Sequence, residues 1–575
     1  MRIAFHACAL VLLATASVPA ASQSHQPRLD PRQTEKKFEA FQVEQQRARK
    51  LAIKVPTLAK PETPLADTKP LFKLTGVSLR GGRVISRDMI AETYRSYIGQ
   101  TVSQADLVAI AGKVSDLYRE AGYHLSRAIV PPQDIKNGRI EISVIEGKIT
   151  EIVLKEEGAE QFSIRALLDP IAAEQVSRLT TLERQLLLVN ELPGVRIADT
   201  SLEEIGVATG RFRLTVYAKT WRISTALSLD NLGTSALGPL QWYLTSALNS
   251  YLVGGDRLGL NVSTNPLDPP EIRFGRLSYD RPIGVDGLRL GALASYSEVW
   301  PGDERKQLNT LIQTETYELR GSIVPLLSRT YSLRLTAIAG FSDVSERDAL
   351  GTKYRDHIRT VGLAADYQQH DGLGGSNYLT VALRQGIDVL GASHRGDGLP
   401  SRDDASANFS VLNVAFTRYQ KLSDAWSLKI ATAGQWTSTP LLTSQQFYVG
   451  GTAFGRGYDT GEVGGDKGIA GSLELRFNQV ITHNFLKGYQ LYGFIDRGVV
   501  WNTDDDINDL TLTSVGGGVR LYLSDELQAD VAISAPLDYR SLANTSRHPR
   551  ILFSLSKFFA HCPAMVHIHC PQIAN

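Results

Sequence analysis

Residues Gly450–Glu474 read GGTAFGRGYDTGEVGGDKGIAGSLE, a stretch too rich in glycine for a helix and too long for a tight hairpin turn. Its centre, Gly455-Arg456-Gly457-Tyr458, places one permanent cation between two residues that have no side chain. Glycine allows sharp turns and the close approach of another surface, and a planar guanidinium suits a carboxylate. The sequence therefore predicts a long loop that packs against another part of the chain through Arg456.

A candidate carboxylate for Arg456 lies in Leu491–Trp501, LYGFIDRGVVW. The alternation of this strand-like segment puts its apolar residues on one face and Asp496 on the other. The residues of the apolar face are Leu491, Gly493, Ile495, Val499 and Trp501. We interpret the two stretches as a loop folded into the lumen of a barrel and clamped by Arg456 to Asp496 on the wall. A flexible surface loop and an unrelated aspartate are the alternative, because such short matches are weak on their own.

The length, charge and cysteine content of the chain indicate which kind of protein it is. At 575 residues several domains are expected, and 61 Lys and Arg residues against 60 Asp and Glu residues provide no basic excess for a nucleic-acid partner. Residues 1–22 have the pattern of a signal peptide, with an apolar core too short to span a bilayer. Only Cys562 and Cys570 follow it, so disulfides do not build the fold. We expect an exported protein whose membrane-spanning part, if present, is β.

Residues 23–54 are polar and contain one helical pattern. Within Thr34–Ile53, Phe38 and Phe41 fall on a thin apolar face, with Pro31 near the start. This pattern predicts a moderately amphipathic helix over Thr34–Ile53, and a solvated helix is the alternative reading. Residues 55–70 contain four prolines and predict an extended linker.

Residues 71–146 and 147–219 each predict a small α/β unit of order β-α-α-β-β. In the first unit we expect a strand over residues 72–79, helices over 88–98 and 103–121, and strands over 125–130 and 139–145. In the second we expect a strand over 148–155, helices over 163–171 and 181–191, and strands over 195–200 and 211–217. Thr180 or Thr181 is expected to cap the last helix. Two units of one topology in tandem indicate an internal repeat.

Residues 220–559 alternate between apolar and polar side chains in many segments with aromatic ends. One example is Tyr331, Leu333, Leu335, Ala337, Ala339 and Phe341. Such segments, joined by turn residues, are typical of a transmembrane β-barrel, and the region has room for about sixteen strands. A soluble sandwich also alternates, but the signal peptide, the length of the region and the aromatic ends favour the barrel. Strands expected near 469–482, 489–501, 513–523, 527–537 and 550–559 make the glycine-rich loop external and place the C-terminus in the periplasm.

The sequence resembles the two-partner secretion transporters of the FhaC/ShlB type. The resemblance rests on Tyr118–Gln133 with Ile145-Glu146-Gly147, on Leu182–Gly194, on Gly455–Tyr458, and on the strand motif from Phe494 through Asp496 to Gly498. It implies a mainly β protein: a sixteen-stranded barrel, two periplasmic POTRA domains at 71–146 and 147–219, a pore-plugging N-terminal helix, and an inward-folded sixth external loop. It also implies the pairing of Arg456 with Asp496.

The resemblance implies partners as well. A large secreted exoprotein of adhesin or haemolysin type would bind the POTRA domains, lipid of the outer membrane would surround the barrel, and the barrel assembly machinery would insert it. Neither enzymatic activity nor a cofactor is expected. An assembly factor for other barrels and a passive porin are the alternative functions. Two POTRA domains with a plug helix argue against the first, and the POTRA-like region argues against the second.

The chain departs from the family pattern at two places. Gly455 stands where the family usually has Val, from which we expect a looser loop tip. Residues 560–575 extend beyond the terminal aromatic residues Phe558 and Phe559. This tail contains histidines and both cysteines, and we expect a periplasmic disulfide or a disordered appendage rather than a metal site. The aspartates from Asp504 lack the glycine that a calcium loop needs, so no metal is expected there.

Overall fold

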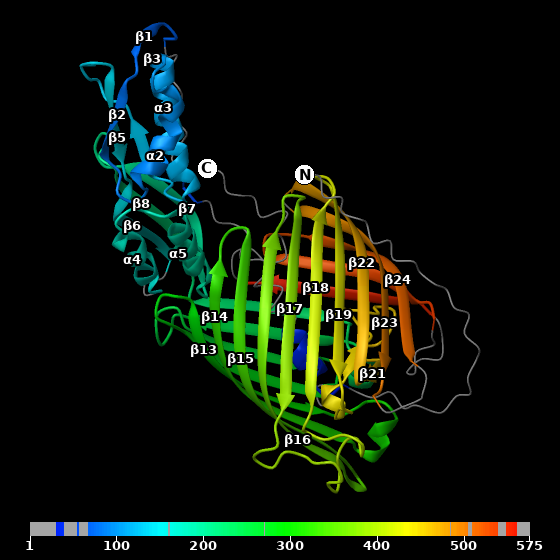
Figure 1. Cartoon of the computed structure of the whole chain (residues 1–575). Helices are drawn as coiled ribbons and strands as arrows, with labels where there is room; N and C mark the ends of the chain where they lie inside the picture. The colour runs from blue at the N-terminus through cyan, green and yellow to red at the C-terminus, as the bar shows by residue number, and fades with distance from the viewer. Residues whose placement is uncertain are drawn as a thin grey trace.

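The computed structural model describes residues 30–39, 55–56, 67–158, 162–268, 271–483, 485–503, 509–538 and 548–559. It consists of two small α/β units followed by a closed β-barrel (Figure 1). The predicted signal peptide, most of the predicted linker, the aspartates 504–506 and the tail 560–575 lie outside the described residues. None of the helices in the described ranges has the length and apolar content that a membrane-crossing helix needs.

The first α/β unit packs two helices on a three-stranded sheet of order β2-β5-β4. Its elements are β1 (Pro70–Lys73), β2 (Gly76–Gly81), α2 (Arg87–Tyr94), η1 (Arg95–Tyr97), β3 (Thr101–Ser103), α3 (Gln104–Glu120), β4 (Arg127–Ile129) and β5 (Arg139–Ile145). The single strand expected over residues 72–79 is two strands, because β1 pairs with β3 outside the main sheet. Ser103 and Asp106 form a capping box at the start of α3, which fixes where that helix begins.

The second unit repeats this topology with the sheet order β6-β8-β7. Its elements are β6 (Lys148–Gly158), α4 (Ile164–Ala173), α5 (Leu179–Glu191), β7 (Val195–Glu204) and β8 (Arg211–Thr220). The predicted cap at Thr180 or Thr181 is wrong, because α5 begins earlier and Arg178 at its N-cap position makes no side-chain cap. Instead, the Glu174 carboxylate accepts hydrogen bonds from the Arg178 amide at 2.8 Å and the Thr181 hydroxyl at 2.6 Å.

Sixteen antiparallel strands close the barrel, which confirms the predicted number. They are β9 (Ile223–Asp230), β10 (Gln241–Asn249), β11 (Arg257–Thr264), β12 (Ile272–Ile283), β13 (Leu288–Val299), β14 (Leu311–Leu327), β15 (Tyr331–Asp348), β16 (Gly351–His370), β17 (Gly375–Gly386), β18 (Ser410–Lys421), β19 (Trp426–Thr437), β22 (Lys467–His483), β23 (Leu486–Trp501), β24 (Leu510–Tyr522), β25 (Leu527–Pro536) and β26 (Arg550–Phe558). The last strand pairs with the first over five residues. Trp426 and Trp436, at the two ends of β19, are exposed on the outer surface, as the predicted aromatic ends require.

Two segments fill part of the lumen. The sixth external loop, residues 438–466, contains η4 (Thr443–Gln445) and a hairpin of β20 (Phe447–Val449) with β21 (Val463–Gly465). Residues 33–39 form a helix inside the barrel, drawn in dark blue in Figure 1; we call it the lumen helix. It covers the start of the helix expected over Thr34–Ile53, and residues 40–53 lie outside the described ranges.

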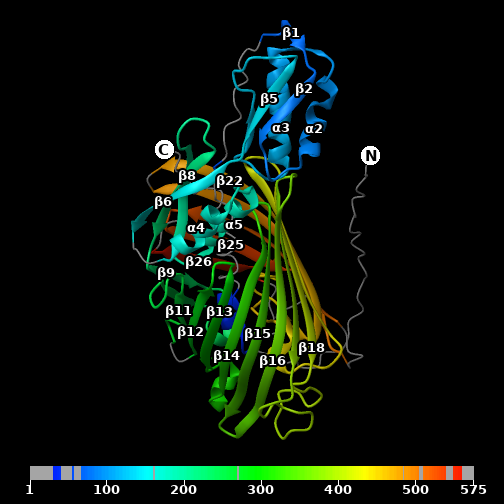
Figure 2. The same ribbon diagram turned by 60° about the vertical axis from the view of Figure 1, so that its left-hand side comes forward.

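The second α/β unit docks on the barrel at the ends of several strands (Figure 2). Val324 and Leu327 of β14 belong to the same buried cluster as the core of this unit, as does Val55 at the start of the predicted linker. Two ion pairs cross the junction: Arg334 binds Glu191 at 2.7 Å, and Arg329 binds Glu183 at 2.7 Å. The strand ends on this side therefore face the α/β units.

Candidate functional site

The candidate site lies where the tip of the sixth loop meets the inner wall of the barrel. Arg456 Nε lies 2.9 Å from Asp496 Oδ2, and Arg456 Nη2 lies 2.8 Å from Oδ1. The backbone amides of Gly455 and Arg456 also donate to Oδ2, at 3.3 and 3.1 Å. Asp496 is fully buried. One carboxylate thus receives four donors from one loop, two of them charge-assisted bonds of a single guanidinium.

The barrel orients Asp496 through a row of residues on three neighbouring strands. Ser472 of β22 and Ser514 of β24 lie opposite Asp496 in the register of the sheet. The Ser472 hydroxyl donates to Oδ1 at 2.7 Å, and the Ser514 hydroxyl lies 3.5 Å from Oδ2. These contacts orient the carboxylate. Because both hydroxyls are neutral, they do not compensate its negative charge, which is paired with Arg456.

Sequence reasoning missed a second carboxylate, Glu474 of β22. It accepts from Arg456 Nη1 at 2.6 Å, from Arg476 Nε at 2.8 Å and from Arg520 Nη1 at 2.9 Å. It is only 2% exposed, so three cations share one buried anion. Its inward position could have been found from the alternation of β22, since Leu473 and Leu475 on either side of it are exposed on the outer face.

The motif residues around Arg456 shape the loop tip. Gly455 has φ +99, a left-handed conformation that side chains rarely adopt, and this favours glycine there. At Gly457 an added Cβ would lie 2.9 Å from backbone atoms of Ala535 and Pro536, so only glycine lets the loop come this close to β25. Tyr458 is fully buried, and its hydroxyl donates to the Thr513 carbonyl at 3.1 Å.

The two remaining motif residues lie on β23 and face the lumen. The guanidinium of Arg456 stacks over the Phe494 ring, 3.4 Å from its centroid, which adds a cation–π contact to the ion pairs. An added Cβ at Gly498 would lie 2.6 Å from the Val449 side chain, so this glycine makes room for β20. The predicted residues Gly455, Arg456, Gly457, Tyr458, Phe494, Asp496 and Gly498 therefore all belong to the interface between loop and wall.

The lumen helix contacts another part of the wall, on strands β9, β10 and β12. Lys37 Nζ lies 2.7 Å from Asp230 Oδ2 at the end of the first barrel strand. Phe38 is 3% exposed and packs on Tyr243 and Phe274, with ring centroids 5.5 and 5.2 Å apart. Lys36 lies over the ring of Tyr448 in the sixth loop, 5.0 Å from its centroid. The helix therefore joins the first strand, the wall and the loop.

The described residues contain no group of three or more His, Cys, Asp or Glu side chains that could hold a metal ion. The tail with Cys562 and Cys570 lies outside those residues. The contacts that the structure shows at the site are ion pairs, hydrogen bonds and a cation–π contact.

Comparison with known proteins identifies the family of this fold and site. Residues 212–521 match the family described as haemolysin secretion/activation protein ShlB/FhaC/HecB, and residues 72–147 match the ShlB-type POTRA domain. The first match spans more than half of the chain, so the chain belongs to the ShlB/FhaC/HecB family of haemolysin secretion/activation proteins. It is an outer-membrane transporter of the two-partner secretion type, with its POTRA region in the periplasm, and it acts on an exoprotein partner.

The chain is also similar to curated relatives, and its fold is similar to that of a solved structure. The chain is similar to the heme/hemopexin transporter protein HuxB of Haemophilus influenzae, at 24% identity over 85% of this chain and 87% of the relative. It is similar to the outer membrane transporter CdiB of Dickeya dadantii, at 22% identity over 82% and 84%. The fold resembles that of CdiB from Escherichia coli, with a TM-score of 0.73, 18% identity and coverage of 92% and 98%.

Proposed function

We propose that this transporter exports one large exoprotein, of adhesin or haemolysin type, which crosses the barrel in an unfolded state. The single observation that carries this proposal is a barrel whose lumen is partly occupied by the sixth loop and the lumen helix and whose strand ends carry the docked α/β units. Such a path admits an extended chain and leaves no need for a chemical conversion or a cofactor. Lipid of the outer membrane would surround the barrel, and the barrel assembly machinery would insert it.

Capture of the exoprotein would occur at free sheet edges of the α/β units. Among the described residues, β2 and β4 each pair on one side only within the first sheet, and so do β6 and β7 in the second. An unpaired edge offers backbone donors and acceptors to an added strand, a known mode of peptide recognition. A fragment of residues 67–220 should bind the amino-terminal region of the exoprotein. If the folded fragment fails to bind at high micromolar concentration, capture occurs elsewhere.

The loop–wall contact would act as a clamp. Arg456 and its two carboxylates Asp496 and Glu474 would keep the sixth loop inside the barrel in the state described here, and the motif glycines would set how closely it packs. The lumen helix would close the remaining path until it is withdrawn toward the periplasm, where the chain continues to Val55.

The experiment that tests the function pairs the transporter with the secreted protein encoded beside its gene. Cells that lack the transporter should retain this protein in the periplasm, and complementation should return it to the surface. The levels of other outer-membrane barrels should not change. A general loss of other barrels would instead support an assembly factor, and export that is indifferent to the transporter would support a passive porin.

A further inference from the structure

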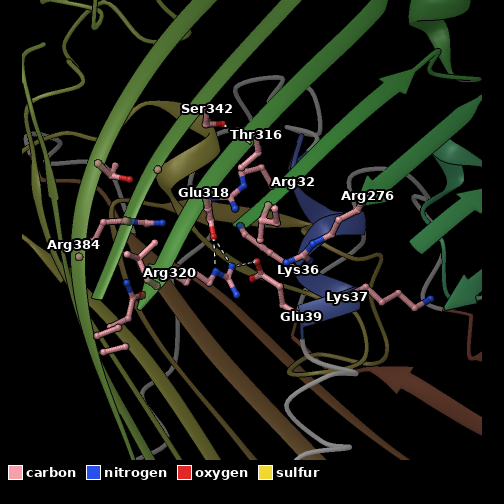
Figure 3. Close-up of a pocket in the computed structure, with 18 of the residues that line it drawn as sticks. Arg32, Lys36, Lys37, Glu39, Arg276, Thr316, Glu318, Arg320, Ser342 and Arg384 are labelled. Atoms are coloured by element: carbon pink, nitrogen blue, oxygen red, sulfur yellow. Dashed lines mark hydrogen bonds and ion pairs between the residues drawn. The ribbon is translucent and has the colours of Figure 1, made fainter. Parts of the chain in front are cut away.

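A cavity of about 900 Å³ lies in the lumen between the lumen helix and the inner face of strands β11–β17 (Figure 3). Among the described residues that line it, nine are arginine or lysine and five are aspartate or glutamate. Much of the remaining wall is formed by small residues, such as Ser278, Gly291, Ser322, Thr336, Gly362 and Ala382. An excess of cations in an enclosed space attracts anions, since low-dielectric walls concentrate the field.

Three of these cations have no carboxylate partner. The other six each lie within ion-pair distance of an aspartate or glutamate. Arg257, Arg276 and Arg384 have no such contact in the part of the chain that the structure describes. Arg276 is only 2% exposed, and its Nε and Nη1 have no hydrogen-bond partner there; the same holds for Nε of Arg384. Buried guanidinium N–H groups without acceptors are unfavourable, so an anionic ligand on this wall would be stabilised by them.

The register of the sheet arranges the cations in an extended row. Through successive pairs from β11 to β17, Arg257, Arg320 and Arg384 lie on one line across the strands. Three strand spacings separate each arginine from the next, or about 14 Å. An extended polypeptide covers this distance in about four residues, so its side chains at every fourth position point to the same face. Because barrel strands are tilted, the row also climbs along the lumen.

The lumen helix already places carboxylates against this wall. Glu39 lies 3.8 Å from Arg320. Glu35 accepts a hydrogen bond from the Ser295 hydroxyl at 3.3 Å, and Ser295 lies directly opposite Arg276 in the register. Of these two carboxylates, which lie four residues apart on the helix, Glu39 contacts a wall arginine and Glu35 contacts the serine beside another.

We propose that the inner wall of β11–β17 is a binding surface for the carboxylate side chains of an extended acidic segment of the exported chain. Glu35 and Glu39 of the lumen helix occupy part of this surface in the closed pore and leave when the acidic segment takes their place. The proposal names a substrate feature and rests on the proposed export function. Its test does not use export.

The test is pore block in planar bilayers by a soluble peptide with the repeat Glu-Ser-Gly-Ser. The full-length chain should be blocked, and high salt should weaken the block because it screens the charges. The triple variant Arg257→Gln, Arg276→Gln, Arg384→Gln should need about tenfold more peptide. Arg273→Gln is the matched control: Arg273 lies on β12 like Arg276 but faces outward, so block should not change. Deleting residues 24–54 should strengthen the block, since Glu35 and Glu39 no longer compete.

Several results would overturn the proposal. Equal block of the wild type and the triple variant would exclude the arginines, and equal block by the corresponding Lys-Ser-Gly-Ser peptide would exclude charge recognition. Block by inorganic phosphate at matched charge would assign the site to small anions instead. Insertion is checked by heat-modifiable migration, and if the triple variant does not insert, Arg384→Gln alone should still weaken the block about threefold. A pore that is blocked as expected but exports nothing would contradict only the export function.

Discussion

Arg456 reaches Asp496 with its side chain and with its own backbone amide, at 2.9 and 3.1 Å from the same oxygen Oδ2. The carboxylate of Asp496 therefore binds the backbone of the loop as well as the charged side chain of Arg456. A pair of exposed charges would contribute about 0–1 kcal/mol, whereas removing one partner of a buried pair costs about 3–5 kcal/mol.

The first prediction concerns this pair. Arg456→Ala and Asp496→Ala should each reduce secretion while the barrel remains inserted. The exchange of Arg456→Asp with Asp496→Arg should restore only part of it, because the two backbone amides would then face a cation. The measurement is the coupling in the double-mutant cycle, with insertion checked by heat-modifiable migration. Simple additivity of the single effects would mean that the pair does not hold the loop.

The second prediction concerns Glu474, which three arginines share. Glu474→Gln leaves those cations with one carboxylate fewer in a buried site and should destabilise the folded barrel by about 3 kcal/mol. The temperature at which the heat-modifiable form is lost should fall accordingly. Glu526→Gln serves as a control, because Glu526 forms a partly exposed pair with Lys557 that is worth little. Equal shifts for the two variants would contradict a special role of Glu474.

The third prediction concerns Gly455 at the tip of the sixth loop. At φ +99 a β-branched side chain is strained by about 1–3 kcal/mol. Relief of this strain by a change of the backbone angles would move the amide of residue 455 away from Asp496. Gly455→Val should therefore make the loop more sensitive to protease added outside the cells. Thr452→Val, an exposed position of the same loop, should not. Unchanged protease sensitivity of Gly455→Val would indicate that the loop tip can rearrange freely.

The fourth prediction concerns the lumen helix. Deleting residues 24–54 should raise single-channel conductance, and Phe38→Ala should increase the frequency of openings. The Phe38 variant loses ring contacts with Tyr243 and Phe274, and truncating a buried Phe costs about 3–5 kcal/mol. Phe559→Ala removes an exposed ring and is the aromatic control. If conductance is the same without residues 24–54, the helix does not limit the pore.

The fifth prediction concerns pH and the first α/β unit. Burial lowers the pKa of His124 to about 4, and neither ring nitrogen has a hydrogen-bond partner among the described residues. The unfolded chain protonates this histidine near pH 6.5, so the contribution of His124 to stability is complete above that pH and is lost as pH falls toward 4.

The loss should amount to about 3 kcal/mol. It can be measured from urea unfolding of the 67–220 fragment between pH 7.5 and 4.5. His124→Leu, which cannot titrate, should give a flatter pH profile than the wild type. Parallel profiles would mean that His124 is as easily protonated in the folded unit as in the unfolded chain.

Local periodicity explains which features could be predicted from the sequence. A strict period of two placed Asp496 on the inner face of its strand and gave the number of barrel strands, because both depend only on alternation and connection lengths. Glu474 was missed because two of its partners, Arg456 in the sixth loop and Arg520 on β24, come from other parts of the chain. A short sequence motif does not contain residues that are distant in the sequence, so it cannot indicate these contacts.

Non-local contacts also explain the errors in the α/β units. The strand expected over residues 72–79 divides because Leu74 donates to the carbonyl of Gln100, and the chain before it pairs with β3. Helix α5 begins before Thr180, and the Thr181 hydroxyl donates to Glu174 instead of accepting from a backbone amide of the first turn. A side-chain contact made before the helix thus engages the residue that the pattern assigned as the cap.

Val55 is buried in the junction between the second α/β unit and the barrel, while Glu39 ends the described part of the lumen helix. The fifteen residues between them span at most roughly 55 Å. A withdrawn helix therefore stays in the neighbourhood of the pore, at an effective concentration of the order of millimolar. In the gating that we propose, closure is then an intramolecular step: a free copy of the helix would have to reach millimolar levels to compete, and each pore would reclose on its own helix regardless of how many neighbours share the membrane.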